Sequence, residues 1–306
     1  MDGFINLNKP LGLTSHDCVA RVRRLLAIKK VGHGGTLDPA ASGVLPIAIG
    51  RATRLLPFLP EDKAYRAVIR FGMTTATDDL EGEVLTQTPC PQLTEAAAIA
   101  PLPQFLGTIQ QIPPQYSAVQ VAGKRLYDLA RKGHVVEAPV RTVTVTKIAP
   151  MMWAGGDFPE LTVDIACGAG TYIRAIARDW GQQLGLGATL ASLVRTRSSG
   201  FVLETSLSLE TLAQQIEAQT FCPVEPAIAL QHLPKLTLPE PLARRWRQGQ
   251  KPLISAADVD VSPSWVARSL QIFDEAEQFL GISTLAASDP PHHYQLIPKM
   301  VFEPLG

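Results

Sequence analysis

The sequence predicts an α+β fold in two domains, a larger domain of mixed strands and helices followed by a small β-rich domain. The chain has 306 residues, more than one hydrophobic core usually holds. Segments with strand alternation and segments with helical spacing are interspersed up to about residue 218. Beyond residue 233, short apolar runs at 265–267, 270–273, 279–282 and 295–297 are separated by turns, which is typical of a small β domain.

The first elements are a short strand over 4–7 and a helix that starts at Thr14 or Ser15 and runs to about residue 27. Both residues are good N-caps, and apolar side chains recur along one face of the helix. Lys9 lies in the turn between strand and helix. Its side chain could brace the loop or contact a phosphate group.

The next stretch, VGHGGTLDP, surrounds His33 with glycines and places Asp38 before a proline. Glycines allow a ligand to approach the backbone closely, and a following proline biases Asp38 away from helical geometry. An apolar strand is expected over 44–49. The stretch is compatible with a positioned reactive carboxylate and also with an ordinary Asp-Pro turn.

A strand is expected over 63–72, with Tyr65 on the face that alternates toward the core. Tyr65 could be a core aromatic or a platform on which a base stacks. The polar segment 74–82 reads as a turn in which Asp79 could hold an arginine. Residues 94–106 predict a helix interrupted by two prolines, and strands are expected over 142–148 and 161–167.

Between these elements, residues 112–134 mix prolines, glycines and tyrosines with basic groups that include Lys124 and Arg125. Cations and aromatic faces together suit single-stranded nucleic acid, although a simple connector would also explain the composition. A helix begins near Tyr172, with Thr171 as its expected cap, and places Arg174 in its first turn. Because the helix dipole disfavours a cation there, Arg174 is expected to have a fixed anionic partner.

Composition excludes several classes of protein. No apolar run approaches the roughly 20 residues that a membrane helix needs. The four scattered cysteines and the polar start predict reduced thiols in a cytoplasmic protein, without a disulfide or a metal site. Residues 1–60 carry eight basic and three acidic groups, which suits a polyanionic partner even though the net charge of the chain is zero.

The segments GHGGTLDP, KAYRAVIRFG, IPPQYSAV with GKRLYDLARKG, and CGAGTYIRAIARDWG occur here in one order. Together they resemble the TruB family of tRNA pseudouridine synthases over essentially the whole chain. The resemblance implies a pseudouridine-synthase fold, with a mixed, mainly antiparallel central sheet flanked by helices. It further implies a catalytic domain over 1–232 with a thumb-like RNA-binding insertion at about 114–142, and a PUA-like RNA-binding domain over 233–306.

The resemblance also implies roles for individual residues. Asp38 would be the catalytic aspartate, Tyr65 would stack on a flipped base, and Arg174 would pair with Asp38. The other residues expected at the site or on the RNA are His33, which would enter the RNA loop, Asp79 and Tyr172, which would support the site, Leu193, which would line the uracil pocket, and Lys9, Lys124 and Arg125.

The activity implied is isomerisation of uridine in the T-arm stem–loop of tRNA, at the position numbered 55. The reaction needs no cofactor, and none is expected. The protein is expected to act as a monomer, without an obligate protein partner or a membrane. Two alternatives remain open, a tRNA-binding or tRNA-folding protein without catalysis, and a related synthase directed to ribosomal RNA.

Overall fold

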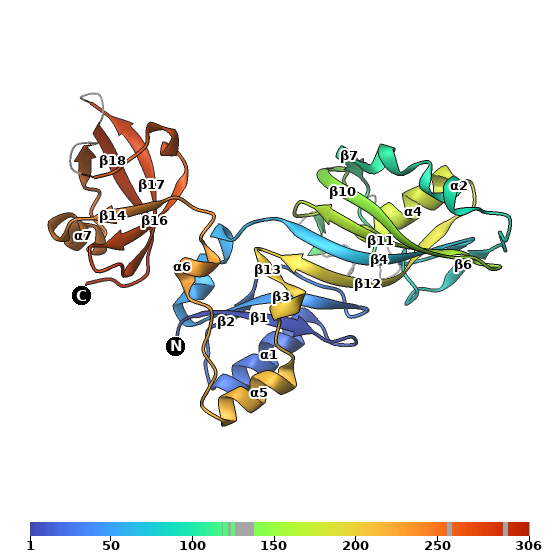
Figure 1. Ribbon diagram of the computed structural model, residues 1–306, viewed down its shortest axis with the longest axis horizontal. Helices are drawn as coiled ribbons and strands as arrows, with labels where there is room; N and C mark the ends of the chain where they lie inside the picture. The colour runs from blue at the N-terminus through green and yellow to red at the C-terminus, as the bar shows by residue number, and fades with distance from the viewer. Residues whose placement is uncertain (118, 122–123, 126–137, 256–258, 290–292, 306) are drawn as a thin grey trace.

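A computed structural model describes residues 1–117, 119–121, 124–125, 138–255, 259–289 and 293–305. Helices and two large sheets confirm the predicted α+β class, and the C-terminal part is β-rich as expected (Figure 1). Within these ranges, no helix is long and apolar enough to cross a membrane. The four cysteines are free thiols, as predicted.

The larger sheet contains nine strands in the described part of the chain. Its main path runs in the order β1 (Gly3–Lys9), β3 (Ala41–Ile49), β12 (Ala188–Ser198), β4 (Lys63–Phe71), β11 (Glu160–Cys167), β10 (Arg141–Ala154) and β7 (Gly107–Gln111). The short strands β2 (Val31–His33) and β13 (Phe201–Val202) pair with β3 and β12. The β3–β12 pair is parallel, whereas the other described pairs of this sheet are antiparallel, which confirms a mixed, mainly antiparallel sheet.

Helices pack their apolar faces against the larger sheet. α1 (Ser15–Leu26) has Thr14, one of the two predicted residues, as its N-cap, and Thr14 forms a capping box with Asp17. α1 packs with α5 (Leu209–Glu217) against β1 and β3. α4 (Ile173–Gln183) buries Trp180 against β4 and β11. Its N-cap is Tyr172 without a side-chain cap bond, so the prediction of Thr171 as the cap was wrong by one residue; the Thr171 hydroxyl donates to the Gly168 carbonyl instead.

Smaller elements complete this part of the chain. The two prolines divide the helix expected over 94–106 into α2 (Glu95–Ile99) and a 3₁₀ turn, η2 (Leu102–Phe105). The others are η1 (Gly50–Phe58), β5 (Met73–Thr75), β6 (Val84–Gln87), β8 (Gln120–Val121), β9 (Lys124–Arg125), η3 (Leu203–Thr205) and α6 (Pro226–Ala229).

The C-terminal sheet has the order β14 (Lys235–Leu238), β16 (Ser269–Asp274), β17 (Phe279–Ser288), β18 (His293–Val301) and β15 (Leu253–Ser255). The strand expected at 265–267 was wrong, because Pro263 begins a 3₁₀ turn, η4 (Pro263–Trp265), at that point. The sequence prediction also missed α7 (Glu240–Arg247), which is only eight residues long and buries Trp246 in the core of this sheet.

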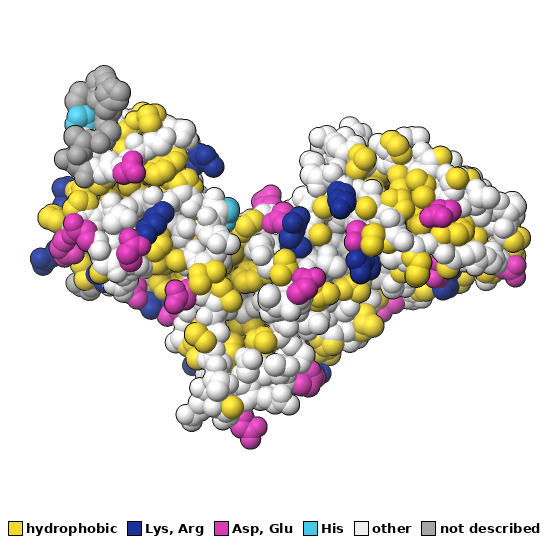
Figure 2. Space-filling model, viewed as in Figure 1, with side chains coloured by type: hydrophobic (Ala, Val, Ile, Leu, Met, Phe, Trp, Pro, Cys, Tyr) yellow, Lys and Arg dark blue, Asp and Glu magenta, His cyan; other side chains and the backbone are white. Residues whose placement is uncertain are grey.

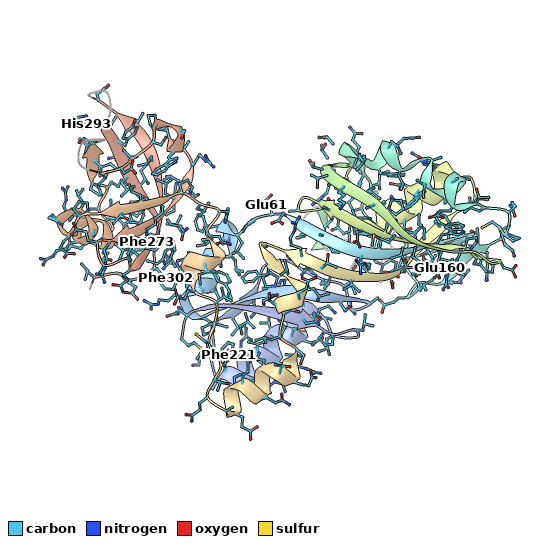
Figure 3. All side chains as sticks on the ribbon, viewed as in Figure 1. Glu61, Glu160, Phe221, Phe273, His293 and Phe302 are labelled. Carbon is cyan, nitrogen blue, oxygen red and sulfur yellow. The ribbon has the colours of Figure 1, made fainter. Side chains whose placement is uncertain are left out.

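An apolar cluster joins the two sheets. Ile282, Met300 and Phe302 of the C-terminal sheet pack in one cluster with Phe4 and Leu55. Phe302 lies where the C-terminal sheet faces α6 and the N-terminal elements (Figure 3). Arg51 donates to the Phe302 carbonyl at 2.9 Å and lies over its ring, so polar and apolar contacts fix the domain junction together.

Candidate active site

The structure brings Asp38 and Arg174 together across 136 positions of sequence. The Arg174 guanidinium lies 2.9 Å from the Asp38 carboxylate, which is the anionic partner that the position of Arg174 at the start of α4 predicted. Both residues line a pocket that holds about 340 Å³ of empty space, including the part open to solvent. Leu190 and Leu193 of β12 supply apolar side chains to the lining of this pocket.

The backbone of the Asp38 loop is fixed by five consecutive carbonyl groups, each of which accepts a hydrogen bond. The Arg195 guanidinium donates to the carbonyls of residues 35 and 36, and the Ser15 hydroxyl donates to the carbonyl of residue 37. The amide of residue 41 donates to the carbonyl of residue 38. The carbonyl of residue 39 accepts from the amide of residue 12 and from the Lys9 ammonium. These donors come from four different elements of the chain. Asp38 therefore projects from an immobilised backbone, while 42% of its side chain remains exposed.

Arg174 is held as firmly as the loop. Its side chain is 8% exposed, and its other contacts are the Asp79 carboxylate at 3.4 Å and the carbonyls of Thr77 and Tyr116 at 3.1 and 3.0 Å. Asp79 in turn accepts hydrogen bonds from the Thr77 hydroxyl and from a backbone amide. As predicted, Asp79 holds an arginine, and that arginine is Arg174.

Tyr65 lies on β4 opposite Arg195 of β12 and is not among the residues that line the pocket. It is 7% exposed and belongs to the main core cluster, so its ring is at present packed as a core aromatic. Burial raises the pKa of its hydroxyl, although the neighbouring Arg195 acts in the opposite direction. A role for Tyr65 in stacking stays a prediction.

Lys9 was expected on the RNA, but the structure places it inside the loop scaffold. It is completely buried, and its ammonium group donates to the carbonyls of Pro10, Leu13 and Pro39. Burial lowers the pKa of this ammonium group. This geometry fits the bracing role and leaves no exposed surface for a phosphate.

His33 ends β2 beside the loop, with its ring edge-on to His16 at 5.3 Å between centroids. Its Nδ1 accepts the amide of Gly35. Burial lowers the pKa of His33, and the nearby His16 and Arg195 add to the shift. These influences favour the neutral form of the ring.

The remaining predicted residues are distributed around the site. Leu193 lines the pocket, whereas Tyr172 caps α4 and packs against Val119 and Ala138. The backbone of Tyr172 is held by both ends of the Gln111 side-chain amide, a contact that the sequence did not reveal. The backbone of Lys124 and Arg125 forms β9, but their side chains and most of the segment 114–142 lie outside the described residues.

Residues 23–173 match the N-terminal domain model of the TruB family pseudouridylate synthases, and residues 234–302 match a C-terminal domain model of Pseudouridine synthase II TruB. The chain is 55% identical over 306 residues to tRNA pseudouridine synthase B of Nostoc sp. (strain PCC 7120), covering 100% of both chains. This protein belongs to the TruB family. It is thus a pseudouridine synthase, an isomerase.

Other TruB relatives and a solved structure agree with this assignment. The tRNA pseudouridine synthase B of Acaryochloris marina is 54% identical over 93% of this chain and 95% of its own. A crystal structure of a Cbf5-Nop10-Gar1 complex contains a chain that is 26% identical, with a TM-score of 0.75 over 99% of this chain and 85% of that one. The fold of this TruB protein is therefore shared with Cbf5.

Across the residues that the structure describes, no group of three or more His, Cys, Asp and Glu side chains could hold a metal ion. The functional residue that the sequence prediction missed is Arg195. In the sequence Arg195 is one residue of an ordinary strand pattern. The parallel pairing of β12 with β3 brings its side chain to the backbone of the segment that carries Asp38. The sequence signal that could have indicated a role for Arg195 is its place on the same strand as Leu193, which was expected at the site.

Proposed function

We propose that this protein isomerises uridine to pseudouridine at position 55 in the T-arm of tRNA, with Asp38 as the catalytic carboxylate. The observation that carries the proposal is the Asp38–Arg174 ion pair in the lining of a partly apolar pocket. The names of the two relatives above support tRNA as the substrate.

The reaction breaks the bond between C1′ and N1, rotates the base, and joins C1′ to C5. C5 loses its proton and N1 gains one, so that atoms and electrons balance without an oxidant, a reductant or an energy donor. The Arg174 guanidinium lies 2.9 Å from the Asp38 carboxylate and holds it toward the pocket that the nucleotide would enter.

The target base has to leave the stack of the RNA loop, which costs a few kcal/mol. His33 lies on the rim of the loop that carries Asp38, and its neutral ring is suited to fill the space that the base vacates. The extruded base would lie against Leu190 and Leu193, and stacking on Tyr65 would return about 1–3 kcal/mol.

The RNA surface extends beyond the pocket in this proposal. The segment 114–142 acts as a thumb over the RNA, with Lys124 and Arg125 on phosphates, and residues 233–306 form the second RNA-binding domain. Figure 2 shows a notch in the outline between the C-terminal sheet and the larger sheet, with Lys and Arg side chains on both sides of it and Asp and Glu side chains among them. Action as a monomer in the cytoplasm, without an obligate protein partner, completes the proposal.

A second candidate is a synthase directed by other RNA to ribosomal RNA, favoured by the structural similarity to Cbf5. The identity of 55% to a tRNA pseudouridine synthase B over the full chain, against 26% to the Cbf5 chain, favours the stand-alone tRNA enzyme. A protein that only binds or folds tRNA would not need the buried Arg174 aimed at an exposed carboxylate.

Tritium release tests the proposal on the side of the RNA. A tRNA transcript labelled at C5 of its uridines should release one equivalent of tritium per tRNA when incubated with the protein alone. A transcript in which U55 is replaced by C should bind and release none. Release from both transcripts would place the target elsewhere, and release from neither would leave tRNA binding as the function.

A further inference from the structure

A second arginine of α4 follows Arg174 by one helical turn. Arg178 donates to the Asp78 carboxylate at 2.9 Å, to the Ile112 carbonyl at 2.8 Å, and to the carboxylate of its neighbour Asp179 at 2.9 Å. Residues four apart on a helix project from the same face. Arg178 and Arg174 therefore point toward the same neighbouring segments.

These segments are the turn 77–79 and the segment 112–116. Arg174 contacts the carbonyls of Thr77 and Tyr116, while Arg178 contacts Asp78 and the carbonyl of Ile112. Each arginine thus bridges the turn to the segment, one helical turn apart. We call the four contacts the arginine clamp.

Asp78 occupies an unusual place in the clamp. Its backbone adopts a left-handed conformation with φ of 60°, and its carbonyl accepts the amide of Leu190, a residue that lines the pocket. Its side chain is 15% exposed. Burial raises the pKa of its carboxyl, and Arg178 is the largest influence in the opposite direction. The Arg178 guanidinium, 2.9 Å from this carboxylate, is therefore the contact that offsets its burial.

The next residue along the turn, Asp79, contacts Arg174 directly at 3.4 Å. Asp79 and Asp38 thus approach the same guanidinium, so the direction of Arg174 depends on where the turn is held. A shift of the turn by one ångström would alter both ion pairs, and a misplacement of that size can cost about 100-fold in rate.

We propose that Arg178 and Asp78 are positioning residues for the isomerisation, which hold the turn 77–79 and the segment 112–116 so that Arg174 faces Asp38. Neither residue contacts the nucleotide in this account. The inference rests on the proposed function, because its kinetic readout is turnover of tRNA.

The test compares D78N, R178Q and the double variant with wild type, using the full chain. Asparagine tolerates the left-handed backbone at position 78 nearly as well as aspartate, so D78N removes the charge alone. The matched control is R66Q. Arg66 and Asp164 form an ion pair of similar length, 2.8 Å, across β4 and β11 of the larger sheet, and this pair is exposed.

Single-turnover rates at saturating tRNA should fall at least about 10-fold in D78N and in R178Q, an effect of about 1.4 kcal/mol on the barrier. The double variant should be no slower than the slower single variant, because both remove the same contact. Affinity for tRNA should stay within about threefold of wild type, and R66Q should keep its rate. Assays at temperatures well below each variant's melting point exclude loss of folded protein.

A crystal structure of R178Q supplies a readout that does not depend on turnover. The Arg174–Asp38 separation should exceed 4 Å in the variant, against 2.9 Å in wild type. The proposal is overturned if both single variants turn over within about twofold of wild type, or if R178Q keeps the wild-type ion pair. If wild type itself releases no tritium from tRNA, the proposed function fails, and the crystal structure still decides the positioning.

Discussion

Replacing Arg195 by methionine should loosen the loop that carries Asp38 and destabilise the whole fold. Arg195 is fully buried and donates to the carbonyls of Val44, Thr36 and Gly35 at 2.7, 3.1 and 3.2 Å. Methionine preserves the apolar stem but removes the donor of the buried Val44 carbonyl, at about 1–3 kcal/mol, and of the two part-buried carbonyls of Gly35 and Thr36, at less each. Together we expect a loss of about 2–4 kcal/mol in the free energy of unfolding.

Thermal unfolding and single-turnover kinetics measure this effect. For a domain of this size the loss should lower the melting temperature by at least about 4 °C. The matched control is R197M, because Arg197 lies two residues further on the same strand and makes an exposed ion pair with Asp62, with 44% and 41% of the side chains exposed. That pair should contribute no more than about 1 kcal/mol. Equal melting temperatures for R195M and R197M would refute the role of Arg195 as the loop anchor.

Three further predictions concern the same region. Gly43→Ala should prevent stable folding, because φ is 106° at this position and an added Cβ would overlap the backbone of the facing strand. In the control Gly34→Ala the atoms nearest to the added Cβ are 3.4 Å away, so this variant should melt within a few degrees of wild type. Similar losses of melting temperature in the two variants would contradict this prediction. Because the pKa of His33 in the folded state lies below its unfolded value of 6.5, the stability of the protein should fall as the pH decreases through 6.5. Between pH 7.5 and 5.5, the melting temperature of H33N should therefore decrease less than that of wild type. Tyr65→Leu should slow single turnover about 5- to 150-fold with tRNA affinity retained, and an unchanged rate would leave Tyr65 as a core residue.

Local sequence signals predicted the elements where they were strong. The cap expected at Thr14 or Ser15 and the alternation along β4 placed α1 and β4 correctly, because caps and periodicity are local properties. They failed where tertiary packing decides the outcome. α7 is stabilised by Trp246, which is buried in the core of the C-terminal sheet. That core forms only when distant strands assemble, so no local sequence pattern predicts this helix.

The candidate site shows the same division. Asp38 and Arg174 could be predicted because each stands in a local context that requires explanation, a proline-restricted loop and the start of a helix. The sequence left Lys9 open between bracing the loop and contacting phosphate, and it missed Arg195, because the partners of both side chains are backbone carbonyls. A carbonyl acceptor has no sequence signature, so basic residues that support a loop look like basic residues that bind RNA.

The central claim is that the Asp38 carboxylate carries out the isomerisation, and the most direct test is tritium release by Asp38→Asn. The amide keeps the shape of the side chain and can still accept a hydrogen bond from Arg174, but it has no negative charge. The variant should bind tRNA labelled at C5 with wild-type affinity and release no tritium, even at enzyme excess. Release at the wild-type rate would show that another group performs the chemistry.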